Sequence, residues 1–162
     1  MKTFRLALLA AAVLLMFQNC TIIQPGEVGV DVKLGKAKKN LLMPGPHHYA
    51  PKLLRHVVRY ETRTINHNKE FHFHSSEGIY VDVNLTILYH IKIDSVLSIH
   101  NHYGPYYESL LIDDYAETFL RKIGLKYEAQ DLISHRNEIE KDVMEHLAEV
   151  LAPRGIITES IM

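Results

Sequence analysis

Two hydrophobic patterns follow each other along the chain, and each predicts a different kind of secondary structure. Apolar and polar side chains alternate over residues 27–35 and again over the longer stretch 79–93. A period of two is typical of strands with one buried and one solvated face. In the first stretch the side chains expected to be buried are Val28, Val30, Val32 and Leu34. Shorter strands are expected over residues 53–63 and around Phe71 and Phe73.

Beyond Ser95 the apolar period lengthens towards 3.6 residues, which predicts helices. One helix is expected to carry Leu111, Phe119 and Ile123 and to end at Gly124, and a second helix is expected over residues 134–152. Residues 40–51, with three prolines, predict an irregular connection, and residues 156–161 predict a last short strand. Strands followed by helices indicate an α+β fold, with a mainly antiparallel sheet and helices packed on one face.

The first nineteen residues form a different kind of segment. Lys2 and Arg5 precede an unbroken apolar run, Leu6 to Phe17, which has the length of an export-signal core and is too short to span a bilayer comfortably. The single cysteine, Cys20, follows this run after Gln18 and Asn19. This order resembles a bacterial lipoprotein signal, in which the cysteine is lipidated. Asn19 departs from the small residue usual before that cysteine, so an uncleaved anchor and a plain secretory signal stay open as alternatives.

Length and charge exclude several classes of protein. A chain of 162 residues with 47% hydrophobic and 23% charged residues can bury the core of one domain, so whole-chain disorder is not expected. The net charge of −1 provides no basic field for nucleic acid. One cysteine cannot form an internal disulfide or a cysteine-rich zinc site.

Five stretches, taken in order, resemble one known family. IIQPGEVGVDVKLGK and LLMPGPHHYAP resemble the opening of the band 7 or SPFH domain, and SSEGIYVDVNLTILYHI resembles its central strand. YYESLLIDDYAETFLRKIG and YEAQDLISHRNEIEKDV are similar to the helices that follow. The last two stretches carry the family's signature positions, which here are Arg121, Ala129, Asp131, Leu132, Arg136 and Ile139. The resemblance spans residues 22–162 and is nearest to the prohibitin branch.

The resemblance implies a membrane-attached, extracytoplasmic scaffold of the prohibitin or stomatin type. Residues 1–19 are then the signal or anchor, residues 20–162 the band 7 domain, and Cys20 the lipid attachment point on the periplasmic side of a bacterial membrane. Members assemble on membranes and organise lipids and proteins, so the implied partners are membrane lipid, further copies or related band 7 proteins, and a membrane protease. The family's usual coiled coil does not follow within these residues, which leaves a truncated gene copy open as a further explanation.

The residues themselves suggest no catalytic, cofactor-binding or metal site. No nucleophile elbow, Walker loop or dinucleotide-binding motif occurs, so we expect no enzyme. Adjacent Asp113 and Asp114 are interpreted as a solvated helix edge. His72 and His74 share one strand face, as do His100 and His102 if extended, and we expect surface histidines rather than a zinc site. The alternative function is an exported lipoprotein that binds a small ligand or metal through these histidine-bearing faces.

Overall fold

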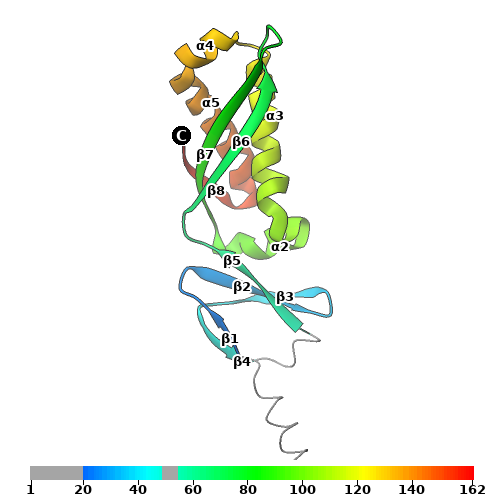
Figure 1. Ribbon diagram of the computed structural model, residues 1–162. Helices are drawn as coiled ribbons and strands as arrows, with labels where there is room; N and C mark the ends of the chain where they lie inside the picture. Colours follow the sequence, from blue (N-terminus) through cyan, green and yellow to red (C-terminus); the bar gives the residue numbers. More distant parts are fainter. Residues whose placement is uncertain (1–19, 49–54) are drawn as a thin grey trace, which may run out of the picture. The chain divides into compact units, whose positions relative to one another are not determined.

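The computed structural model describes residues 20–48 and 55–162, and the chain divides into two compact units, Met1–Tyr60 and Glu61–Met162. Figure 1 shows the elements of both units in sequence colours. The predicted signal segment, residues 1–19, lies outside the described residues.

The N-terminal unit is built from two small sheets. In the first, β1 (Cys20–Ile23) pairs antiparallel with β4 (Gly45–His48). In the second, β2 (Glu27–Lys33) lies between β3 (Lys36–Leu42) and β5 (Arg55–Glu61), whose last residue belongs to the next unit. The irregular connection expected over residues 40–51 is therefore wrong for residues 40–42, which belong to β3, and for Gly45–His48. This proline-containing second stretch pairs as a short strand with one neighbour among the described residues.

Strand β2 is buried on both faces, which the alternating pattern did not predict. Val28, Val30 and Val32 are buried as expected, but Asp31 between them is only 1% exposed. Leu34 was expected to be buried and instead is 71% exposed, because it occupies the turn between β2 and β3. Leu34 and Gly35 both have positive φ, at 50° and 77°, as a two-residue hairpin turn of type I′ requires.

The C-terminal unit contains one three-stranded antiparallel sheet. Its order is β6 (Ile65–His74), β7 (Tyr80–Ile91) and β8 (Ile156–Ile161). The β6–β7 hairpin keeps one register from Ile65 opposite Tyr89 to His74 opposite Tyr80. The buried side chains alternate along both strands, as the sequence predicts, and include Phe71, Phe73, Leu85, Ile87 and Tyr89.

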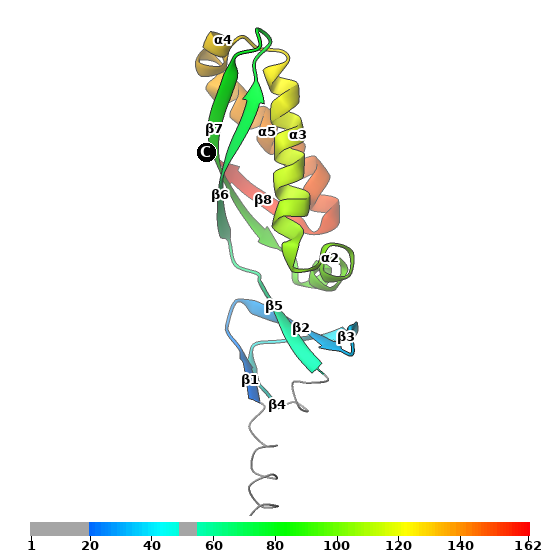
Figure 2. The same ribbon diagram turned by 45° about the vertical axis from the view of Figure 1, so that its right-hand side comes forward.

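Helices cover one face of this sheet, which confirms the predicted α+β class (Figure 2). The chain forms α2 (Val96–Tyr103), the π-helical turn η3 (Glu108–Asp113), α3 (Asp114–Gly124), α4 (Ala129–Ser134) and α5 (Arg136–Leu151). Three short 3-10 turns complete it: η1 (Ile93–Ser95), η2 (Gly104–Tyr106) and η4 (Ala152–Arg154). Helix α3 packs on β6 and helix α5 on β8, so the apolar stripes of both helices meet the buried face of the sheet.

Candidate functional site

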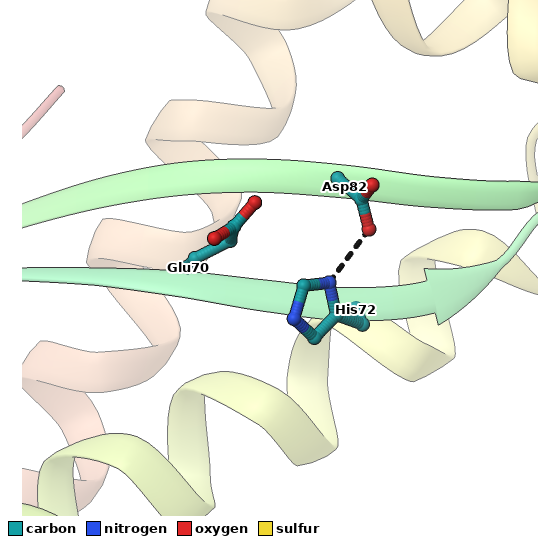
Figure 3. A group of neighbouring side chains, drawn as sticks. All are labelled: Glu70, His72 and Asp82. Carbon is teal, nitrogen blue, oxygen red and sulfur yellow. Dashed lines mark hydrogen bonds and ion pairs between the residues drawn. The ribbon is translucent and has the colours of Figure 1, made fainter.

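The outer face of the β6–β7 hairpin gathers titratable side chains from both strands. His72 and His74 do share this face, as expected, because they are two residues apart on β6. The register places Asp82 directly opposite His72, and Glu70 precedes His72 on the same face. Ligand atoms of Glu70, His72 and Asp82 all lie within 4.8 Å of one another, and all three side chains are exposed (Figure 3).

Two contacts hold the imidazole of His72 in place. Its Nδ1 lies 2.6 Å from Oδ1 of Asp82, which is hydrogen-bond distance. The ring of Tyr80 stacks on it with centroids 5.7 Å apart and planes at 14°, and the same Tyr80 ring meets His74 edge-on at 5.5 Å. The spacing of the sequence pointed to the two histidines but not to Glu70 and Asp82. A hairpin turn placed at Gly78 would have predicted the pairing of His72 with Asp82, and Glu70 lies two residues before His72 on the same strand face.

The other histidine pairs do not form comparable groups. His100 and His102 lie on helix α2, so the extended geometry that would align them does not exist, and His102 Nδ1 contacts the Ser98 carbonyl oxygen at 2.8 Å. In β4, His47 Nε2 contacts the carbonyl oxygen of Met43 at 2.7 Å. The rings of His102 and His47 each contact a backbone carbonyl four residues away in their own segment.

A second polar cluster lies beneath the sheet, where η3 meets β6. Asp113 is only 5% exposed, and its carboxylate contacts His67 Nε2 at 2.7 Å and Lys69 Nζ at 2.5 Å. The interpretation of Asp113 as part of a solvated edge is therefore wrong, although Asp114 is exposed. The reason is the wider π-helical turn, which sets Asp113 towards the sheet. The ammonium group of Lys69 already neutralises the carboxylate of Asp113.

Three further polar side chains extend the cluster into the core. The Tyr89 hydroxyl lies 2.9 Å from the Tyr107 hydroxyl and donates a hydrogen bond to the Glu108 carboxylate. Burial, followed by these hydrogen bonds, raises the pKa of Tyr89 far above its usual range. Tyr89 is fully buried and stays protonated, so the group serves as an internal hydrogen-bond network that joins β7 to η3.

An apolar groove of about 620 Å³ opens on the C-terminal unit, between the first half of β7 and helices α4 and α5. Three of its lining side chains are large, apolar and substantially exposed: Ile79 at 49%, Ile133 at 82% and Met162 at 54%. Arg136 and Glu140, which form an ion pair with atoms 2.7 Å apart, provide polar lining. Exposed apolar surface gathered in one groove is typical of a site that another molecule covers.

The groove runs along an open edge of the sheet. Thr86 exchanges both backbone hydrogen bonds with Met162, at 2.9 and 3.0 Å, so its N–H and C=O face the β8 side. The N–H and C=O groups of alternate residues point to the same edge of a strand, so those of Asp82 and Asn84 also face the β8 side. Among residues 20–48 and 55–162, no strand pairs with Tyr80–Leu85 there. These groups form a strand edge available for pairing (Figure 1).

The N-terminal unit holds one buried ion-pair group that sequence analysis missed. The Asp31 carboxylate accepts two hydrogen bonds from the Arg55 guanidinium, and Lys38 Nζ lies 3.3 Å away. The Arg55 hydrogen bond is the main reason that the pKa of Asp31 is lowered below 3.8, while burial acts in the opposite direction. This two-pronged contact ties β5 to β2, so its role is structural.

The three charged positions of the predicted signature have structural roles. Arg121 and Arg136 each bind a carboxylate one helical turn away, with 2.5 Å to Glu117 and 2.7 Å to Glu140. Asp131 lies in the first turn of α4, where a carboxylate suits the positive helix end.

The backbone of Cys20 begins β1, opposite His48. Within the described residues, no helix combines the length and apolar character needed to cross a bilayer.

The sequence matches the model of a known protein family over most of its length. No curated protein matches the chain. The sequence model of the SPFH domain / Band 7 family matches residues 21–162, which include all of the C-terminal unit and the N-terminal unit from residue 21. Because this match extends over most of the chain, the protein belongs to the SPFH domain / Band 7 family.

Proposed function

We propose that the chain is a membrane-attached scaffold domain on the extracytoplasmic side of a bacterial membrane, of the prohibitin and stomatin type. The family match over residues 21–162 supports this proposal. Members of the family are generally non-enzymatic scaffolds that associate with membranes and self-assemble. In this role the domain holds membrane proteins or lipids together and restrains a membrane protease.

Attachment is proposed at Cys20, which follows the apolar run Leu6 to Phe17. Several acyl chains on one cysteine would hold the protein stably, whereas a single chain binds a bilayer only marginally. The test is fractionation of cells that express the full chain with Cys20→Ala. We expect the variant to leave the membrane fraction and to lose acyl labelling, while Asn19→Ala retains both because it preserves the cysteine. Unchanged attachment of Cys20→Ala would contradict lipid anchoring and favour the uncleaved anchor.

Self-association is proposed to use the apolar groove of the C-terminal unit. The observation that carries this step is the exposure of Ile79, Ile133 and Met162 around one groove beside an open strand edge. A second copy is the occupant that the family's general self-assembly favours. It would remove apolar side chains from water, at about 25 cal/mol per Å² of surface covered, and could pair with the backbone of Asp82 and Asn84.

The chain offers a closely matched pair of variants for this step. Ile133 and Leu125 are exposed to similar extents, 82% and 75%, but only Ile133 lines the groove. We expect Ile133→Asp to lower the mass of the purified full chain in detergent, measured by sedimentation, and Leu125→Asp to leave it unchanged. Circular dichroism checks that both variants fold. A monomeric parent protein, or equal masses for both variants, would contradict the proposed interface without affecting the attachment step.

A further inference from the structure

We propose that Glu70, His72 and Asp82 form a binding site for a first-row divalent cation such as Zn²⁺ on the outer face of the β6–β7 hairpin. This site goes beyond the scaffold function and uses none of the residues of the attachment step. The donor set of one imidazole and two carboxylates suits such a cation, because Mg²⁺ and Ca²⁺ prefer oxygen ligands alone.

The three side chains are close enough to share one cation. Ligand atoms of the three side chains lie within 4.8 Å of one another, whereas ligands around a tetrahedral zinc ion stand about 3.3 Å apart. Because the three side chains are exposed, rotation about their side-chain bonds can bring the ligand atoms closer together without backbone movement. The His72 nitrogen that now lies 2.6 Å from Asp82 would contact the cation instead, and water would complete the coordination.

The three side chains project from two paired strands, which fix their relative positions. The hairpin holds a continuous register across all ten residues of β6, so the Cα positions of the three ligands are fixed. Tyr80 stacks on His72 and restricts the orientation of its ring. Sites on paired strands with supported side chains keep their geometry better than sites on loops.

The charges on this face favour a cation. The alternation of both strands places eight side chains on this part of the outer face, and none of them is Lys or Arg: Asn68, Glu70, His72, His74, Tyr80, Asp82, Asn84 and Thr86. Lys69, the nearest base in sequence, contacts Asp113 instead. Within the described part of the chain, the side chain of Glu70 makes no hydrogen bond or ion pair. The two carboxylates therefore present an uncompensated negative charge to a cation.

Two other histidine–carboxylate pairs of the same unit differ from the proposed site, because their carboxylates have further partners. His90 lies 2.7 Å from Glu159, nearly the same distance as in the His72 pair, but Glu159 also accepts a hydrogen bond from Thr64. His67 contacts Asp113, whose other oxygen is occupied by the Lys69 ammonium. Only the His72 pair has a neighbouring carboxylate without such a partner, among the residues that the structure describes.

The test is a calorimetric titration of the full chain in detergent, free of any polyhistidine tag, with Zn²⁺ at neutral pH. We expect one site, and at least about tenfold weaker binding in His72→Asn and in Glu70→Gln, because loss of even an outer-shell partner costs a metal site about 10–100-fold. His90→Asn is the matched control and should bind as the parent does. Mg²⁺ at the same concentration should not compete.

Location is tested separately with Mn²⁺ as a paramagnetic probe. The backbone amide signals of His72 and Asp82 should broaden before those of His90 and Glu159. The proposal is overturned if the parent binds Zn²⁺ more weakly than about 100 µM. It is also overturned if His72→Asn and His90→Asn bind equally well, because the cation would then be held adventitiously elsewhere. All three substitutions lie at the surface, and circular dichroism confirms that the variants fold.

Discussion

Gly124 lies directly against the backbone of His74. A Cβ added at Gly124 would stand 2.3 Å from the His74 carbonyl oxygen and 2.6 Å from the ring of Phe73. Helix α3 thus approaches β6 more closely at its last residue than any side chain permits. The glycine that sequence analysis interpreted only as a helix stop is also the point where helix and hairpin meet.

Gly124→Ala is therefore expected to destabilise the C-terminal unit by about 2–3 kcal/mol, because a backbone carbonyl cannot move aside as a flexible side chain can. The measurement is urea unfolding followed by circular dichroism. Gly78→Ala, at the turn of the same hairpin, is the control. A Cβ there meets nothing within 4 Å, so only its positive φ of 80° opposes alanine and the loss should be about 1 kcal/mol. Equal losses would show that the close approach is relieved elsewhere.

The stability of the N-terminal unit should depend on pH through Asp31. Hydrogen bonds from Arg55 and Lys38 lower the pKa of Asp31 below 3.8 in the folded state. A depressed carboxylate pKa means that the ionised group stabilises the fold fully above the unfolded pKa. This contribution is lost as the pH falls below about 4 and through the folded pKa. Hydrogen exchange of β2 amides, measured from pH 6 downwards, should show the loss.

Asp31→Asn is expected to lower the stability of this unit by roughly 2–3 kcal/mol at pH 7, because it leaves the Arg55 guanidinium without its charged acceptor. The variant should also lose the acid-dependent part of the unfolding free energy. A variant that unfolds with the same dependence below pH 4 as the parent would show that other carboxylates govern the acid transition.

The turn between β2 and β3 offers a stabilising substitution. Leu34 has a φ of 50° and is 71% exposed, so it has an unfavourable backbone conformation with little burial in return. Leu34→Asn should raise stability by about 1 kcal/mol, because Asn followed by Gly35 is the preferred pair for a type I′ turn. Leu125→Asn is the control, since Leu125 is equally exposed but has a φ of −68°. Equal increases in stability in both variants would mean that the more polar surface side chain, and not the turn conformation, is responsible.

Neighbouring aspartates of the π-helical region should respond very differently to the same change. Asp113→Asn weakens the contacts with His67 and Lys69 in a buried setting and should cost about 2 kcal/mol. Asp114→Asn, one residue later and exposed, should stay within about 0.5 kcal/mol of the parent. Thermal unfolding of the two variants makes the comparison. Similar values for both would mean that the ammonium and imidazole are well solvated after all.

The fold class could be predicted because it rests on periodicity, which is local. The period of two over residues 79–93 and the apolar spacing before Gly124 led to β7 and α3 with small shifts in their ends. Helix α5 was expected from residue 134, but a break at His135 separates it from α4. The apolar spacing did not predict the short helix α4 (Ala129–Ser134), because its six residues are too few to establish a period.

The candidate sites could be predicted only in part, because they depend on pairing between distant residues. His72 and His74 share a face by spacing alone, whereas Asp82 joins them through the hairpin register. Asp31 looked like a solvated position, and its burial follows from Arg55, which is 24 residues away. Asp113 looked equally solvated, and the π-helical turn that sets it towards β6 has no distinctive sequence pattern.

The unequal lengths of β7 and β8 divide the amide protons of a single strand into two exchange classes. The amides of Val81 and Val83 point towards β6 and should exchange slowly with deuterium, while those of Asp82 and Asn84 point towards the open edge and should exchange fast. Anything that pairs with this edge will slow the second class and leave the first unchanged. The strand therefore carries its own internal reference, and occupancy of the edge can be measured on the unmodified protein without a label or a substitution.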